Sequence, residues 1–286
     1  RPRDCALLVK SETRGSRDPG VVGLAVFRAG TVGSMNTIDL IIDLHRGNDR
    51  QGPGSAAHTR LAMELAGINR SAGLAIADIG CGTGASALVL ASQSDAIVTA
   101  IDSSSVFIET LRERAERAGL ASRIRPMVGS MEALPFEDHS LDVIWSEGAI
   151  YNIGFETGVR AWRRFLKPGG VIALSELSWT TSDRPNDVEA HWLREYGEIG
   201  TPASKLRVLE EVGYSPVGFF FLPRECWEEQ YYAPLRASFG AFLDRHSHSV
   251  EARRVVEAEE QDIQLYRERG RWYGYGFYIA RRRWDG

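Results

Sequence analysis

Cysteine is scarce in this chain, and long hydrophobic runs are absent from it. The three cysteines, Cys5, Cys81 and Cys226, have no C-x-x-C spacing, which excludes a disulfide framework and a paired-cysteine zinc or redox site. No apolar stretch approaches the roughly 18 to 20 residues that span a bilayer. We therefore expect a soluble protein of a reducing, cytoplasmic compartment, with no membrane partner.

The chain also lacks an excess of positive charge and a metal-binding motif. Its 34 lysines and arginines face 38 aspartates and glutamates, giving a formal net charge of −4. Binding through phosphate groups requires a basic face, and only Arg281–Arg283 resembles one. No cluster of His, Asp or Glu has metal-ligand spacing. Nucleic acid and metal are therefore not expected as partners.

The length of the chain predicts one domain with insertions. Its 286 residues, 43% of them hydrophobic, suffice for one sizeable core. Residues 1–34 are rich in Gly, Arg and Ser and predict a disordered extension or a segment added by cloning. The folded domain is expected over 35–286. It opens with a short amphipathic helix around Ile38–Leu44 and a second helix with Ser55 as its N-cap.

From residue 74 the chain alternates between short apolar runs and helical stretches of ten or more residues. This alternation is typical of βα units stacked on a parallel sheet. We therefore predict an α/β fold, with a mostly parallel sheet of seven strands and helices on both faces. The expected strands are 74–79, 97–102, 124–128, 141–146, 171–177, 216–222 and 272–280, and the expected helices lie near 84–93, 104–118, 156–166 and 202–212.

Two regions do not fit this alternation, 180–200 and 224–269. The first contains Trp192 and Tyr196, and the second contains several aromatic residues and ends in a highly charged helical stretch. We expect these regions to form a helical cap inserted into the domain.

A glycine-rich loop follows the first expected strand. Leu74–Ile79 runs into Gly80–Gly84, of sequence GCGTG, and then into a helix. Residues without a β-carbon let a ligand lie against the backbone, and the N–H groups at the helix N-terminus favour an anionic group. A dinucleotide-binding loop would place its third glycine one residue later and would tolerate Asp78 poorly. Asp78 instead suits the ammonium group of an amino-acid moiety.

A second acid ends the next strand. Asp102 follows Ala96–Ile101, and its carboxylate can accept hydrogen bonds from both hydroxyls of a ribose. An amino acid joined to a ribose describes S-adenosylmethionine (SAM), which is therefore the expected cofactor. A tight turn with Asp102 as a helix cap would explain the glycines but not the paired acids. The predicted cofactor ligands in this part of the chain are Asp78, Gly80, Gly82, Gly84, Asp102 and Ser103.

These residues resemble the first motif of class I SAM-dependent methyltransferases, and the resemblance extends over 36 to about 280. It implies a Rossmann-like fold. Gly129–Phe136 is similar to the adenine-binding segment of the ubiquinone/menaquinone-type branch, although Ser130 stands where that branch usually has an aspartate. The resemblance implies adenine contacts from Ser130 and Met131, with core packing as the alternative for Met131. Residues 146–156, SEGAIYNIGFE, resemble a little-characterised bacterial subgroup.

The segment Arg50–Ser55, of sequence RQGPGS, also resembles that subgroup. In similar enzymes the corresponding segment lies over the methionine end of the cofactor. The resemblance implies that Gln51 binds the cofactor's carboxylate and that Gly54 belongs to the same loop. A plain turn between two helices is the alternative.

Candidate catalytic residues follow from the chemistry of methyl transfer. The main requirement is an acceptor atom held about 3 Å from the methyl carbon, and a general base helps where the acceptor loses a proton. Ligands of open α/β sheets lie at the carboxyl ends of the strands, where Glu147, Tyr151 and Glu176 are found. Glu147 is alternatively a ligand of the cofactor's amino group. The further alternatives are a structural hydrogen bond for Glu147, ordinary packing for Tyr151 and a position on the opposite face of the sheet for Glu176.

Aromatic residues of the expected cap offer walls for a flat or cationic acceptor. The candidates for acceptor binding are Trp179, Trp192, Tyr196 and Tyr275, and ordinary packing is the alternative for each.

The sequence thus predicts a methyltransferase that modifies a small aromatic or nitrogenous metabolite. Similar enzymes methylate electron-rich rings such as indoles in natural-product pathways, and this extension is an analogy. The alternatives are an RNA or protein methyltransferase, a nicotinamide-dependent oxidoreductase, and a regulatory protein that binds SAM without turnover. A homodimer is a possible assembly.

Overall fold

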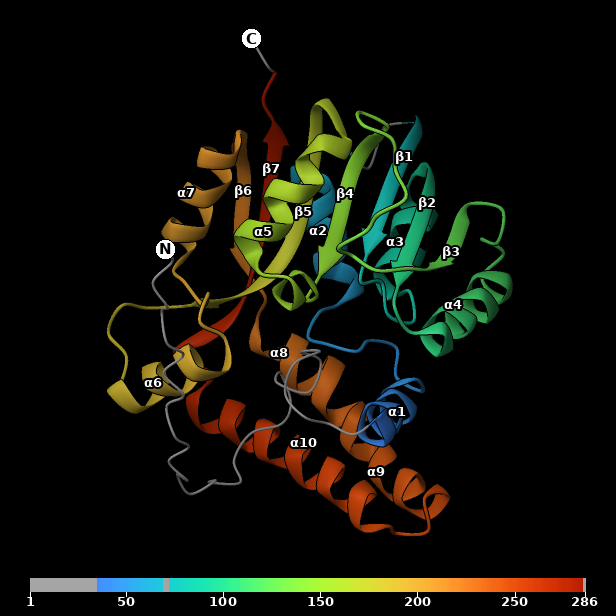
Figure 1. Ribbon diagram of the computed structural model, residues 1–286, viewed down its shortest axis with the longest axis vertical. Coiled ribbons are helices and arrows are strands. Elements are labelled where there is room, and N and C mark those ends of the chain that lie inside the picture. Colours follow the sequence, from blue (N-terminus) through green and yellow to red (C-terminus); the bar gives the residue numbers. More distant parts are fainter. Residues whose placement is uncertain (1–34, 69–71, 285–286) are drawn as a thin grey trace, which may run out of the picture.

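A mixed sheet of seven strands forms the centre of the computed structural model, which describes residues 35–68 and 72–284 (Figure 1). The expectation for 1–34 lies outside the described residues. The strands lie in the order β3-β2-β1-β4-β5-β7-β6. Their bounds are β1 (Ala72–Ile79), β2 (Asp95–Asp102), β3 (Ile124–Val128), β4 (Leu141–Glu147), β5 (Leu166–Trp179), β6 (Tyr214–Phe221) and β7 (Tyr273–Arg282).

The sheet is mostly parallel, as predicted. The strands from β3 to β5 pair in parallel, whereas β7 runs antiparallel to both β5 and β6. Every strand overlaps its predicted range. The largest difference is in β5, which begins at Leu166 because that residue already pairs with Leu141 of β4. The predicted α/β fold class is therefore confirmed.

Helices cover both faces of the sheet and enclose two apolar cores (Figure 1). Three of them begin at a hydroxyl side chain, because Ser55, Ser104 and Thr201 each accept a backbone N–H of the first turn. Ser55 is the N-cap that the sequence predicted. On one face lie α2 (Ala56–Ala66), α3 (Ala85–Gln93) and α4 (Ser105–Arg117), and on the other α5 (Phe155–Trp162) and α7 (Pro202–Val212).

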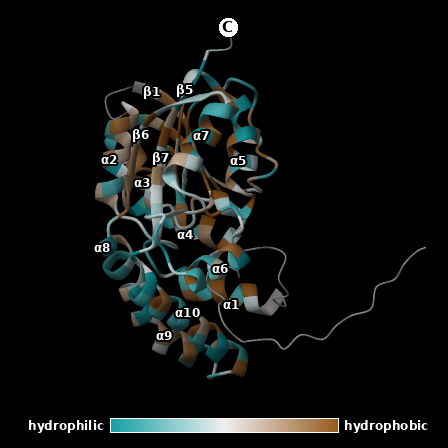
Figure 2. Cartoon of the chain, turned by 90° about the vertical axis from the view of Figure 1, so that its left-hand side faces the viewer, coloured by the Kyte–Doolittle hydropathy of each residue, from teal (hydrophilic) through white to brown (hydrophobic). Residues whose placement is uncertain are grey.

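A separate group of helices lies beyond the carboxyl ends of the parallel strands (Figure 1). Figure 2 shows the strands as a largely hydrophobic layer between helices, while α9 and α10 carry both hydrophilic and hydrophobic residues. Within the described residues, no helix combines the length and the apolar character needed to cross a bilayer. The group consists of α1 (Met35–His45), α6 (Asn186–Glu195), α8 (Arg224–Trp227), a π-helical turn (Glu228–Tyr232), α9 (Ala233–Arg245) and α10 (Val250–Arg269).

Ion pairs fasten α1 to the long helices of this group. Asp43 Oδ2 lies 2.9 Å from both Arg245 Nη2 and His246 Nε2 at the end of α9. His45 Nε2 lies 3.0 Å from Glu259 Oε1 of α10, and both of these side chains are buried. The N-terminal helix thereby becomes part of the cap, although the sequence assigned the cap only to regions further along the chain.

Candidate functional site

A cavity of about 430 Å³ opens at the carboxyl ends of β1, β2 and β4. The order of the strands reverses between β1 and β4, and such a switch point leaves a crevice in open α/β sheets. The loops that follow these strands line the cavity together with α1 and the segment 50–53. Of the predicted site residues, the cavity wall contains Gln51, Gly80, Gly82, Asp102, Ser103, Ser130, Met131, Glu147 and Tyr151.

The glycine loop approaches its neighbours too closely for side chains. Gly80, Gly82 and Gly84 all have positive φ angles, of 72°, 53° and 87°. A β-carbon at Gly80 would overlap the side chain of Ala149, and one at Gly82 would overlap that of Gln51. Gly80 and Gly82 line the cavity, whereas Gly84 does not line it and packs against Leu111 of α4.

Replacing Gly84 by alanine is expected to lower the free energy of unfolding by about 2 kcal/mol. The new methyl group would overlap Leu111 of α4 at a backbone φ of +87°. Urea denaturation measures the loss. Gly67→Ala is the matched control, because its φ is +72° and no atom lies within 4 Å of the added carbon. Equal losses in the two variants would contradict steric conflict as the cause.

Asp102 is held at the tip of β2 by backbone donors. Its Oδ2 accepts the N–H of Gly82 and its Oδ1 accepts the N–H of Ser104, both at 2.9 Å. Burial raises the pKa of the Asp102 carboxyl, and the backbone hydrogen bonds oppose that rise. Because each carboxylate oxygen has further lone pairs, this side chain can still accept hydroxyl groups from the cavity.

Asp78 is fully buried behind the glycine loop and does not line the cavity. Ser86 donates to its Oδ2 at 2.6 Å, while Oδ1 has no hydrogen-bond partner among the described residues. Burial raises the pKa of Asp78 to about 7, with the charge of Glu147 adding to the rise. A buried carboxylate oxygen without a donor is costly. It fits a cationic group of a ligand that lies against the loop.

The apo protein is expected to lose stability as the pH rises because of Asp78. An acid with a raised folded-state pKa contributes stability below its unfolded pKa, near 4, and loses it as the pH rises through about 7. Between pH 5 and 8 this loss is about 2 to 3 kcal/mol. Asp78→Asn should remove it in urea titrations, whereas the exposed Asp138→Asn should not. An unchanged pH dependence in Asp78→Asn would refute the assignment.

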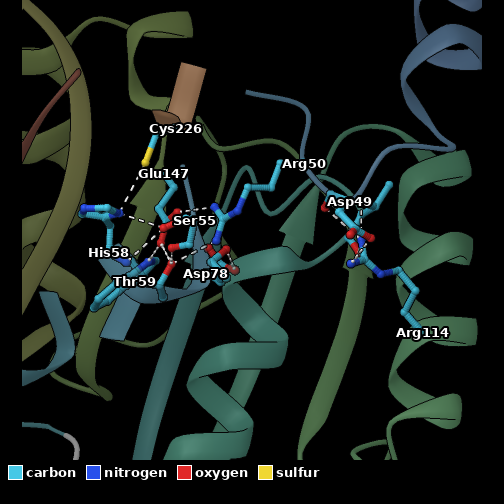
Figure 3. A network of polar contacts seen from close by, with 12 residues as sticks. Asp49, Arg50, Ser55, His58, Thr59, Asp78, Arg114, Glu147 and Cys226 are labelled. Atoms are coloured by element: carbon cyan, nitrogen blue, oxygen red, sulfur yellow. Dashed lines mark hydrogen bonds and ion pairs between the residues drawn. The ribbon is translucent and has the colours of Figure 1, made fainter. Parts of the chain in front are cut away.

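Glu147 forms a buried ion pair with Arg50 at the cavity wall (Figure 3). Arg50 Nη1 lies 2.6 Å from Glu147 Oε2, and its Nη2 donates to Thr59 Oγ1 at 3.1 Å. Glu147 Oε1 accepts from Thr59 Oγ1 at 2.7 Å and from Trp145 Nε1 at 2.9 Å. Both oxygens are therefore engaged, and the geometry suits a fixed anion better than a free general base.

The sequence analysis missed Arg50, which lines the cavity, and Arg114, which supports the glycine loop from outside the cavity wall. Arg114 of α4 donates to the carbonyl and hydroxyl of Thr83 at 3.1 and 2.8 Å and to Asp49 Oδ1 at 3.0 Å (Figure 3). It thus ties the segment before α2 to the glycine loop. The two partners of Arg50 lie 97 and 9 residues away along the chain. Only the motif RQGPGS directed attention to this segment, and no local pattern singles out the arginine.

The side-chain amide of Gln51, predicted to bind the cofactor's carboxylate, forms hydrogen bonds within the protein. Its side-chain oxygen accepts the N–H of Thr83 at 2.9 Å, and its nitrogen donates to the carbonyls of His45 and Asn48 at 3.2 Å each. These contacts hold the segment against the glycine loop, so the nearby guanidinium of Arg50 is the better group for a carboxylate. Gly54 does not line the cavity, and it leaves room for that guanidinium because a β-carbon there would lie 2.6 Å from Arg50 Nη1.

Tyr151 and Glu176 occupy different environments. Tyr151 lines the cavity, and burial together with the charge of Glu176 raises the pKa of its hydroxyl, which therefore keeps its proton and can act as a donor. Glu176 does not line the cavity. It is buried on the α5/α7 side of β5 with Lys205 Nζ at 3.5 Å. Burial raises the pKa of Glu176, and Lys205 opposes that rise.

Three of the four predicted acceptor ligands pack away from the cavity. Trp179 lies under the guanidinium of Arg184 at 4.3 Å, Trp192 packs on Tyr273 at 4.7 Å, and Tyr196 has Lys205 Nζ 5.4 Å from its ring. None of the three lines the cavity. Tyr275 does not line the cavity either, but it lies next to the cavity residue Gly148, where an added β-carbon would be 2.9 Å from Tyr275 Cε2 and 3.5 Å from its hydroxyl.

The other end of the cavity is suited to a flat ring. Met131 lies beside Gly80, with its terminal methyl group 3.5 Å from the position of an added β-carbon. Ser130 accepts the N–H of Glu132 at 3.2 Å, and Phe107 of α4 also lines this part of the wall. Phe107 is a further residue that the sequence did not single out. In residues 35–68 and 72–284 no group of three or more His, Cys, Asp or Glu side chains is placed to hold a metal ion.

Comparisons with known proteins agree with this geometry. Residues 76–170 match the family model described as "Methyltransferase domain". The chain is 32% identical over 160 residues to 27-O-demethylrifamycin SV methyltransferase of Amycolatopsis mediterranei, covering 54% of this chain and 59% of that protein. It is 33% identical over 153 residues to a sarcosine/dimethylglycine N-methyltransferase of Aphanothece halophytica, covering 53% and 55%. The chain thus spans less than two thirds of these relatives.

Solved structures share the fold over a larger part of the chain. A SAM-dependent methyltransferase from Geobacter sulfurreducens, in complex with S-adenosyl-L-homocysteine, has a TM-score of 0.73 at 22% identity and covers 88% of this chain and 100% of its own. The [4+2]-cyclase SpnF has a TM-score of 0.69 at 20% identity and covers 94% and 99%. The predicted Rossmann-like fold is confirmed, and the part of the chain that matches the methyltransferase-domain model, residues 76–170, contains the carboxyl half of β1, β2 to β4 and the glycine loop.

Proposed function

We propose that this chain transfers the methyl group of SAM to a small-molecule acceptor. The observation that carries the proposal is the placement of Asp102, Glu147 and Arg50 on the wall of one cavity, with Asp78 buried behind the glycine loop of that wall. SAM is a cation with a zwitterionic amino-acid end and a ribose, so it offers a partner to each of these charges. A pyrophosphate, by contrast, would be repelled by the carboxylates of this wall.

The residues present fit each part of the cofactor. Asp102 would hold the ribose hydroxyls, Arg50 the carboxylate, and Glu147 with Asp78 the ammonium group, directly or through water. Met131 would cover the adenine with its polarisable thioether. When bound, SAM supplies a methyl group on a sulfonium, whose leaving group is a neutral thioether. The protein's own task is then to place the acceptor in line with that methyl group and to keep water out.

The acceptor would enter from the side of the cap, where Tyr151 lines the cavity and Tyr275 lies next to Gly148 of its wall. Tyr151 keeps its proton and would orient the acceptor by donating a hydrogen bond. The engaged oxygens of Glu147 disfavour a base at this position, so we infer that the acceptor is already nucleophilic. An aromatic or nitrogenous metabolite, such as an indole, meets that condition. The resemblance to the ubiquinone/menaquinone-type branch is consistent with such an acceptor.

Isothermal titration calorimetry with SAM and incubation with methyl-labelled SAM test the proposal. We expect binding at micromolar concentrations and transfer of label to a small molecule from a metabolite panel. Failure to bind SAM would refute the whole proposal. Transfer of label to RNA or protein, with none to small molecules, would instead establish the macromolecular alternative.

A second candidate is a SAM-binding protein that does not transfer the methyl group. The engaged state of Glu147 favours it, because no free general base lines the described part of the cavity on the side of Tyr151. A fold shared with a [4+2]-cyclase also shows that this architecture is not confined to proteins named as methyltransferases. Tight SAM binding without transfer of label to any acceptor would support this second candidate over the methyltransferase.

A further inference from the structure

We propose that Arg114 positions the guanidinium of Arg50 and thereby sets the selectivity of the cavity for the carboxylate of SAM. The inference rests on the proposed function and adds a positioning residue to it. Arg114 belongs to the last turn of α4 and does not line the cavity. It would therefore affect a bound cofactor without touching it.

The backbone around Arg50 depends on tertiary contacts for its position. Residues 46–55 connect α1 to α2 and contain no helix or strand, so no regular hydrogen-bond pattern fixes them. The guanidinium of Arg50 itself lies 2.6 Å from Glu147 and 3.1 Å from Thr59. Where this group stands relative to the glycine loop is decided by the contacts of its two neighbours in the chain, Asp49 and Gln51.

Both of these neighbours are bound at Thr83 of the glycine loop. Gln51 Oε1 accepts the N–H of Thr83 at 2.9 Å. On the other side of Arg50, the Thr83 hydroxyl lies 3.3 Å from the carbonyl oxygen of Asp49. Thr83 is fully buried and so offers a fixed point. The segment that carries Arg50 is therefore held against the loop on both sides of the arginine.

Arg114 joins the two segments with one guanidinium. Its Nη1 shares its hydrogens among the carbonyl and hydroxyl oxygens of Thr83, at 3.1 and 2.8 Å, and the carbonyl oxygen of Asp49, at 3.0 Å. Its Nη2 donates to Asp49 Oδ1 at 3.0 Å (Figure 3). The Asp49 side chain is 92% exposed, so the ion pair adds little. The contacts to the oxygens of Thr83 and to the Asp49 carbonyl carry the connection, and the planar fork of an arginine suits them.

The glycine loop has supports of its own. Gly80 and Cys81 donate their N–H groups to the carbonyl of Ile101 at 2.8 and 3.0 Å, and Gly82 donates to Asp102. Loss of Arg114 should therefore release the segment around Arg50 while the loop and the proposed ribose ligand Asp102 stay in place.

The effect of this release should be confined to one group of the cofactor. Among the residues that the structure describes, Arg50 is the only lysine or arginine of the cavity wall, and the carboxylate is the only anionic group of SAM. Charge-assisted hydrogen bonds between such groups depend on short donor–acceptor distances. A displaced Arg50 should therefore weaken the binding of the carboxylate and leave the binding of ribose and adenine unchanged.

Calorimetric titration with SAM and with decarboxylated SAM tests this inference. The second ligand keeps the sulfonium, amino group, ribose and adenine and lacks the carboxylate. We expect the wild-type protein to bind SAM at least about tenfold more tightly than decarboxylated SAM. Arg114→Gln should bind SAM about tenfold more weakly than the wild type does and decarboxylated SAM within about twofold of it. If Arg114→Gln does not fold, Arg114→Lys replaces it, because a lysine keeps the charge but lacks the fork, and its preference should fall in the same direction.

Arg112→Gln is the matched control, because it removes a half-exposed arginine from the same helix, and it should retain the wild-type preference. Equal binding of the two ligands by the wild-type protein would overturn the inference. So would a wild-type preference in the Arg114 variant, or an equal loss of affinity for both ligands, which would make Arg114 a purely structural residue. In each of these cases binding of SAM by the wild-type protein leaves the proposed function standing, whereas its absence would count against the proposed function itself.

Discussion

Replacing Glu147 by glutamine is expected to lower the free energy of unfolding by about 3 to 5 kcal/mol and to weaken SAM binding. The carboxylate and the guanidinium of Arg50 are both nearly buried, with 8% and 10% of their side chains exposed. Removing one charge leaves the other without a counter-ion in a poorly solvated place. Glutamine also brings an N–H₂ group to a position surrounded by donors, because Thr59 and Trp145 both donate to Glu147.

Urea denaturation and calorimetry measure the two effects of Glu147→Gln. The exposed Glu137→Gln is the control for loss of one negative charge and should match the wild type in both measurements. The double variant with Arg50→Gln should recover part of the lost stability, because it removes the unpaired guanidinium. Additive losses in the double variant would show that the two residues do not act as a pair.

The second large effect is expected at Asp102, where asparagine should reduce the affinity for SAM about a hundredfold. One carboxylate oxygen becomes an N–H₂ group, which faces either the N–H of Gly82 or that of Ser104. The variant therefore loses a backbone hydrogen bond that shapes the glycine loop and an acceptor for a ribose hydroxyl. Both losses act at the same place in the cavity.

Calorimetric titration with SAM measures the effect of Asp102→Asn. Asp95→Asn offers a control on the same strand, since Asp95 is exposed at the opposite end of β2 with Arg123 at 3.8 Å. It should bind SAM like the wild type. An affinity of Asp102→Asn within threefold of the wild type would refute the assignment of Asp102 to the ribose.

The features that could be predicted from the sequence are those that arise from local patterns. A strand that ends in an acid before a glycine loop is a property of about ten adjacent residues, and this pattern directed attention to the glycine loop and Asp102, which line the cavity, and to Asp78, which lies buried behind the loop. The strands and helices of the sheet also follow from short-range alternation of apolar residues. Each of these elements was found in the structure at or near its predicted place.

The features that could not be predicted from the sequence depend on contacts between distant parts of the chain. The alternation of side chains along β5 predicts that Glu176 lies on one face of the sheet, but it does not tell which face is open to the cavity. The structure places Glu176 beside Lys205, on the face covered by α5 and α7. The motif around Gln51 identified a segment that lines the cavity, but the cationic side chain of that segment is its neighbour Arg50, whose partner Glu147 lies 97 residues away. Aromatic composition predicted a cap without showing that Trp179 and Trp192 pack internally. Such assignments require the positions of partners far away in the sequence.

The charges at the cavity wall have a consequence for turnover. Asp102, Glu132 and Glu147 are the carboxylates of the described wall, and Arg50 is its arginine, so the wall has an excess of negative charge. Methyl transfer converts the cationic sulfonium of the cofactor into a neutral thioether. The same wall should therefore hold the spent cofactor less tightly than the fresh one. Under the proposed function, this difference in charge would reduce inhibition by the spent cofactor.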